Sequence, residues 1–105
     1  MNLQITGDRI HLNPAIKTLI SEKIDQQIGK LLTNFSTDIQ IASIRIQKEK
    51  LELFKVNFDM TLPGKKHIYA ETEHILLESA LIDLSHQVEK QIKKYLHHPW
   101  FLSPS

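Results

Sequence analysis

The sequence contains no cysteine, and its 105 residues include only three glycines and four prolines. The absence of cysteine excludes disulfide frameworks, thiolate metal sites and cysteine nucleophiles, and it fits a reducing compartment. Few glycines and prolines, together with 41% hydrophobic residues, argue against a disordered chain. We therefore expect one compact domain with a single core.

Long apolar runs are also missing. No stretch approaches the ~18 residues of a membrane span, and the start, Met1-Asn2-Leu3-Gln4, lacks the pattern of a signal peptide. We therefore expect a cytoplasmic protein that does not contact a membrane. Thirteen Lys and Arg against twelve Asp and Glu give a net charge of +1. Because the total charge indicates no partner, only its distribution is informative.

Motifs of catalysis and metal binding are absent from the sequence. It has no nucleophile motif, no glycine-rich phosphate loop and no convergent pair of acids. Of the six histidines, the adjacent His97 and His98 point in different directions on a helix, and no zinc-type spacing joins the others. We therefore expect neither an enzyme nor a metal or cofactor site.

The chain begins with a short strand, Leu3-Gln4-Ile5-Thr6-Gly7, followed by a capped helix. Asn13 is an N-cap residue, and Pro14 suits the first helical position, where its missing N–H costs nothing. Gly29 lowers helix stability by ~1 kcal/mol relative to alanine, so we expect the end of the helix to fray or bend. A helix over residues 14–32 is predicted by this apolar stripe: Ile16, Leu19, Ile20, Ile24, Leu31 and Leu32.

After residue 38 the period of the hydrophobic pattern changes to two. Residues 42–46 and 54–62 alternate apolar and polar side chains, which predicts two half-buried strands. Pro63-Gly64-Lys65-Lys66 is a turn sequence, because proline presets φ and glycine supplies a positive φ. A further strand is expected over residues 67–72.

Apolar residues then recur every three or four positions from 75 to 97, which predicts a long amphipathic helix. Pro99 ends it, so residues 1–98 form the domain and 99–105 a short apolar tail. The order β-α-β-β-β-α predicts an α+β fold. Both helices should pack on one face of a four-stranded sheet, because only one side of each later strand is apolar. The expected core includes Leu3, Ile5, Ile20, Ile24, Ile44, Ile46, Val56, Phe58, Ile68, Leu81, Leu84 and Val88.

Several basic residues are candidates for nucleic-acid contact. Lys90, Lys93 and Lys94 share a stripe nearly opposite the apolar face of the last helix, which suits a phosphate backbone. The same stripe is also explained as a solvated face that complements the helix dipole. Lys23 and Lys30 flank the apolar stripe of the first helix, where covering the edge of the core is sufficient explanation.

The polar face of the sheet and its turns offer a second group of candidates. Arg45 and Lys55 suit RNA contact there, although protection against sheet aggregation is the simpler explanation. For Lys65 and Lys66 in the following turn, the two explanations are about equally good. Tyr69 on the same face suits base stacking, although one exposed tyrosine on a strand is ordinary. The sequence leaves these alternatives open.

The whole pattern resembles the ribosome hibernation promoting factor family, also called ribosome-associated inhibitor A or ribosomal subunit interface protein. The resemblance covers roughly residues 1–97 and, besides the opening strand, rests on Pro14-Ala15-Ile16-Lys17, Ala70-Glu71 and Lys90-Gln91-Ile92. The chain departs from it at Leu76-Leu77-Glu78-Ser79, where family members usually carry an acidic residue and a tyrosine.

The resemblance implies a short-form, non-enzymatic bacterial protein that represses translation under stress or in stationary phase. It would bind the small ribosomal subunit and its ribosomal RNA in the channel for messenger and transfer RNA, and it would contact neither DNA nor a membrane. No cofactor is implied, and we expect a monomer off the ribosome. The basic positions that match or lie near those of the family are Lys17, Lys23, Lys30, Lys90 and Lys94, beside Lys93 of the stripe.

The alternative is a diverged paralogue without ribosome binding that acts as a protein-interaction module. In that case the apolar Trp100-Phe101-Leu102 of the tail would serve as a docking patch.

Overall fold

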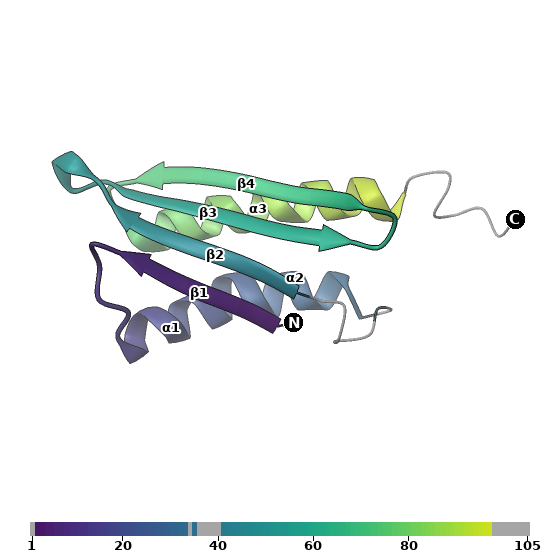
Figure 1. Cartoon of the computed structure of the whole chain (residues 1–105), viewed down its shortest axis with the longest axis horizontal. Coiled ribbons are helices and arrows are strands. Elements are labelled where there is room, and N and C mark those ends of the chain that lie inside the picture. The colour runs from purple at the N-terminus through teal and green to yellow at the C-terminus, as the bar shows by residue number, and fades with distance from the viewer. Residues whose placement is uncertain (1, 34, 36–40, 98–105) are drawn as a thin grey trace, which may run out of the picture.

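The computed structural model of the protein describes residues 2–33, 35 and 41–97. It shows the predicted α+β order, β-α-β-β-β-α (Figure 1). The elements are β1 (Asn2–Asp8), α1 (Pro14–Ile20), the π-helical turn η1 (Ser21–Asp25), α2 (Gln26–Leu31), β2 (Ile41–Lys48), the short 3-10 turn η3 (Lys50–Glu52), β3 (Phe54–Leu62), β4 (Lys66–His74) and α3 (Leu77–Leu96). The expected tail, residues 99–105, lies outside the described residues.

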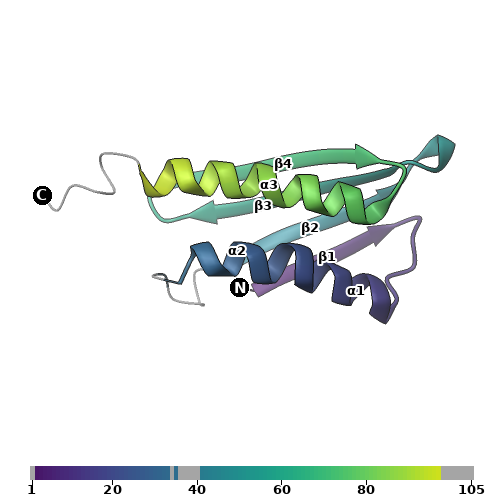
Figure 2. The same ribbon diagram turned by 180° about the vertical axis from the view of Figure 1, so that it is seen from behind.

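The four strands form one sheet in the order β1-β2-β3-β4. The pair β1–β2 is parallel because the chain returns through the first helix, whereas β2–β3 and β3–β4 are antiparallel. Ile44 lies opposite Phe58, and Phe58 lies opposite Ala70. The apolar side chains of neighbouring strands therefore share one face. Both helical segments pack on that face, as predicted (Figures 1 and 2).

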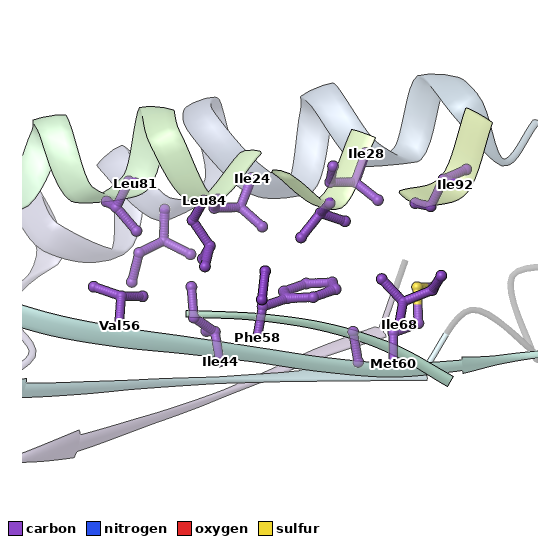
Figure 3. Packing of buried hydrophobic residues seen from close by; sticks show 14 of the residues in the cluster. Ile24, Ile28, Ile44, Val56, Phe58, Met60, Ile68, Leu81, Leu84 and Ile92 are labelled. Atoms are coloured by element: carbon purple, nitrogen blue, oxygen red, sulfur yellow. The ribbon is translucent and has the colours of Figure 1, made fainter. Parts of the chain in front are cut away.

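The core lies between the helices and this face of the sheet. In Figure 3, Val56 and Phe58 point from the strands toward Leu81 and Leu84 of α3, and Ile68 points toward Ile92. The predicted core is confirmed except at β1, where Leu3 and Ile5 are only partly buried. Leu3 and Ile5 stay partly exposed because they line an open groove between β1 and the first helical segment.

The first helix contains a feature that its sequence pattern explains. Ile20, Ile24, Ile28 and Leu32 are fully buried at a strict spacing of four residues. In an α-helix each such step rotates the side chain by about 40°, so the stripe would drift off the core. The wider turn η1 absorbs part of this drift. The irregularity therefore lies at Ser21–Asp25 rather than toward Gly29, where a bend was expected.

The junction of β4 and α3 differs from the prediction. Strand β4 runs to His74, beyond the expected end at residue 72, and α3 begins at Leu77 rather than at Ile75. Thr72 Oγ1 donates a hydrogen bond of 2.8 Å to the carbonyl of Ala80. His74 Nε2 lies 2.5 Å from Asp83 Oδ2. These contacts hold the end of the strand against the first turns of the helix and explain the longer strand.

The N-cap provides a first testable prediction. Asn13 Oδ1 accepts a hydrogen bond of 2.8 Å from the N–H of Ile16, so Asn13→Ala should lower the free energy of unfolding by ~1 kcal/mol. The measurement is a urea titration, in which the midpoint should fall at unchanged slope. Asn13→Asp keeps the acceptor and should unfold close to the parent midpoint. An equal loss of stability in both variants would show that the hydrogen bond between Asn13 and Ile16 is not the cause of the loss.

Candidate nucleic-acid interface

The two helical segments run in the same direction across the sheet, so both end at the same end of the molecule (Figures 1 and 2). The β3–β4 turn lies at that end too, because the Tyr95 hydroxyl of α3 donates a hydrogen bond of 2.9 Å to the Pro63 carbonyl. The fold thereby gathers lysines from three separate segments. We call this group the lysine end: Lys30, Lys65, Lys66, Lys90, Lys93 and Lys94.

All members of the lysine end are exposed. Lys93 pairs with Glu89 at 2.9 Å, and this hydrogen bond lowers the pKa of the Glu89 carboxyl. The other five make no ion pair with any residue that the structure describes. Glu89 is also the only acidic residue in segments 26–31, 63–66 and 89–97. This end therefore concentrates positive charge that the net charge of +1 conceals.

Part of this arrangement has a structural explanation. The carbonyl end of a helix carries partial negative charge, and lysines in the last turn complement it. Lys30 occupies the last turn of α2, and Lys93 and Lys94 that of α3. The dipole does not account for Lys65 and Lys66, which lie in and beside a strand turn.

Lys17 and Lys23 lie apart from the lysine end. Lys17 is exposed on α1, where it lines a groove beside β1 together with Asn2 and Asp25. Lys23 is about half-buried and faces Glu78 of α3 at 3.9 Å. The structure therefore does not bring these two predicted residues together with the others.

The open face of the sheet presents its basic residues already paired. Arg45 Nη2 lies 3.0 Å from Asp8 Oδ2, and hydrogen bonds from Gln47 and Arg45 hold the pKa of the Asp8 carboxyl below its usual value. Lys55 Nζ lies 2.8 Å from Glu71 Oε1. That hydrogen bond raises the pKa of Lys55 and lowers that of Glu71. Both cations of this face are therefore neutralised within the protein.

Tyr69 belongs to the same polar network. Its hydroxyl accepts a hydrogen bond of 2.8 Å from Asn57 Nδ2, and its ring lies beside that of His67 with centroids 6.4 Å apart. His67 Nε2 in turn lies 2.6 Å from Asp59 Oδ1. The ring of Tyr69 is partly exposed and its polar atom is already engaged, so stacking of a base on it stays a prediction.

Two residues of the lysine end, Lys65 and Lys66, were not among the predicted site residues, because RNA contact and protection of the sheet edge explain a charged turn about equally well. Their signal was the dipeptide itself, directly after Pro63-Gly64. Whether these two lysines join other basic residues depends on which elements lie beside the turn, and the tertiary structure decides this.

Other kinds of site find little support in the described residues. Within residues 2–33, 35 and 41–97, no three histidine, aspartate or glutamate side chains group closely enough to hold a metal ion. No helix in the same ranges combines the length and the hydrophobicity that a membrane span requires.

The architecture is that of a small α+β domain with a charged end, and comparison with known proteins identifies its family. The model of the family described as sigma 54 modulation protein / S30EA ribosomal protein matches residues 3–98, so the chain belongs to this family of ribosome-associated proteins. A search of curated protein sequences finds no match.

Two solved structures are similar to the protein over nearly their whole length. A ribosomal subunit interface protein from Coxiella burnetii superimposes with a TM-score of 0.73 at 25% sequence identity, covering 93% of this chain and 100% of that one. The N-terminal domain of Thermus thermophilus Protein Y gives a TM-score of 0.71 at 18% identity, covering 90% of this chain and 99% of that one. The second likeness concerns the fold alone.

Proposed function

We propose that this protein is a ribosome hibernation factor that binds the small ribosomal subunit through its ribosomal RNA. It acts as a monomer in the bacterial cytoplasm and represses translation under stress or in stationary phase by occupying the channel for messenger and transfer RNA. No catalysis, cofactor, DNA or membrane takes part. The observation that carries the proposal is the lysine end, in a chain that belongs to a ribosome-associated family.

The form of the molecule supports a mechanism of steric occlusion. The domain extends 51 × 22 × 19 Å, and a single continuous core holds its elements together. Lysines act as point charges that grip phosphates without reading bases, which suits a folded ribosomal RNA. The lysine end supplies affinity, and the body of the domain supplies the volume that excludes other RNA.

The proposal ranks the basic residues of the molecule. Lys30, Lys90 and Lys94 carry most of the RNA contact because they lie at one end of the molecule and no described carboxylate neutralises them there. Arg45 and Lys55 contribute less, since breaking an internal ion pair offsets part of any gain from a phosphate. The same reasoning lowers the expected contribution of Lys23, which faces Glu78.

The experiment that tests the proposal is co-sedimentation with separated ribosomal subunits over a range of salt concentrations. Binding is expected to the small subunit and not to the large one. If five lysines each neutralise one phosphate, log K should fall with log salt at a slope of about 3.5 to 4.5. Binding to the large subunit alone, or a slope near zero, would contradict the proposal. Binding to neither subunit would favour the diverged paralogue.

The occlusion mechanism is checked by the order of addition. Small subunits that already carry messenger and initiator transfer RNA should bind the protein much more weakly than empty subunits do. Equal binding to both would place the protein outside the channel.

A further inference from the structure

We propose that the β3–β4 turn is a second RNA-binding arm, which clasps a duplex RNA backbone together with the last turns of α3. This inference rests on the proposed function and deepens it, because it assigns Lys65 and Lys66 a role and names the form of RNA. Its basis is the backbone of the turn, its attachment to α3 and the chemistry of the side chains that surround it.

The backbone of the turn is left-handed at Lys65, a conformation that Arg9, Leu51 and Glu52 also adopt in this chain. Leu62 pairs with Lys66, so the loop between the strands consists of Pro63, Gly64 and Lys65. Gly64 has φ 85°, and Lys65 has φ 60°. A left-handed conformation suits glycine or asparagine and is disfavoured for a side chain such as that of lysine. The hairpin therefore does not require a lysine there, and a strained residue in an exposed turn is a reason to look for function.

The turn is fixed to the end of α3. Tyr95, which is 3% exposed, donates its hydrogen bond to the Pro63 carbonyl from within the core. Burial also raises the pKa of the Tyr95 hydroxyl above its usual value. One turn back along the helix, Gln91 hydrogen-bonds the backbone of Tyr69 on β4, with its amide nitrogen 2.5 Å from the carbonyl oxygen. The turn and the end of the helix are thus held in one frame.

Lys66 of the turn arm and Lys94 of the helix arm lie on the same side of the sheet. Side chains alternate along a strand, so Lys66 projects toward the helices, as the buried Ile68 does two residues later. On α3, Lys94 precedes Tyr95 and is exposed. Lys66 and Lys94 therefore flank the same contact between turn and helix. Four lysines of the two arms form no ion pair with a described residue: Lys65, Lys66, Lys90 and Lys94.

The chemistry of the two arms indicates a backbone ligand. Proteins that bind single strands stack bases on exposed aromatic rings. In the described part of the lysine end, Tyr95 is buried, and the partly buried Phe35 packs against it with ring centroids 6.2 Å apart. Positive charges on two arms, with these two rings packed against each other, match phosphates on the two strands of a duplex. Such binding depends on shape and charge rather than on sequence.

The experiment is a fluorescence anisotropy titration of a labelled RNA hairpin duplex with the full chain, over a range of salt concentrations. The variant Lys65→Gln with Lys66→Gln should bind at least about fivefold more weakly, with a salt slope smaller by about 1.8 if both contacts are lost. The matched control is Lys48→Gln with Lys50→Gln, which removes the same charge at the opposite end and should bind like the parent.

Lys65→Gly separates a binding role from a structural one. It relieves the left-handed backbone and should raise the melting temperature while weakening RNA binding. A merely structural role for Lys65 would instead leave binding unchanged.

Each remaining outcome contradicts a specific part of the inference. If Lys90→Gln with Lys94→Gln weakens binding and the turn variant does not, the second arm is wrong and the proposed function stands. If the control variant at Lys48 and Lys50 loses as much affinity as the turn variant, the effect depends on net charge alone. The β3–β4 turn is then not an RNA-binding arm. A parent protein that prefers a single-stranded RNA of equal length would overturn the duplex assignment. If the parent protein binds small subunits but no RNA duplex, this inference is wrong and the proposed function stands. If it binds neither, the proposed function is wrong as well.

Discussion

Replacing Lys90, Lys93 and Lys94 together by glutamate is expected to abolish co-sedimentation with the small ribosomal subunit. The substitutions place three negative charges where the parent presents three exposed positive ones. Losing the phosphate contacts of Lys90 and Lys94 alone would lower the affinity by roughly twentyfold at moderate salt, and repulsion by three glutamates adds to this. The measurement is the bound fraction in a sedimentation assay at constant ionic strength.

The controls for this variant address folding and total charge. Surface substitutions of this kind usually shift stability by only ~0.5 kcal/mol each. Repulsion between Glu89 and a glutamate at position 93 adds about 0.2 to 0.5 kcal/mol. The variant should therefore melt cooperatively, only modestly below the parent. A matched variant with glutamates at Arg9, Lys48 and Lys50 carries the same charge change away from the lysine end and should still bind. Unchanged binding of the α3 variant would instead show that its lysines form an ordinary solvated face.

Phe58→Ala is expected to cause the largest loss of stability from a single substitution. Phe58 is fully buried on β3, between Ile44 of β2 and Ala70 of β4. Truncating a buried phenylalanine to alanine costs about 3 to 5 kcal/mol, because the cavity is only partly refilled. A small domain has a total stability of about 5 to 15 kcal/mol, so the variant should be marginally folded at 37 °C. Urea unfolding at 10 to 25 °C measures the loss.

Phe54 offers a matched control on the same strand. It is only partly buried, and Lys48 Nζ lies 5.7 Å from the centroid of its ring. Phe54→Ala removes the same atoms from the margin of the core and should cost clearly less than Phe58→Ala. Equal losses at the two positions would contradict the central place that the structure gives to Phe58.

The sequence alone determined the order of the elements and the polarity of each face. Side-chain periods of two and about 3.6 residues are properties of short segments, so β2, β3 and α3 could be predicted within a few residues of their observed bounds. The same locality made the Asn13 cap and the exposed stripe of Lys90, Lys93 and Lys94 predictable. Boundaries were wrong where a distant contact decides them, as at His74, which Asp83 of α3 holds in β4.

Only the tertiary structure decided which charges are available and which lie together. Arg45 reaches Asp8 across 37 positions of the chain, and this pair depends on the parallel register of β1 and β2, which no local pattern specifies. The gathering of Lys30, Lys66 and Lys94 at one end depends on the direction of two helices and on the Tyr95–Pro63 hydrogen bond. Periodicity reports the face on which a residue lies. Its neighbours across the fold are set by packing between segments that are distant in the sequence. For this protein, those neighbours neutralise Arg45 and Lys55 and gather five unpaired lysines at one end.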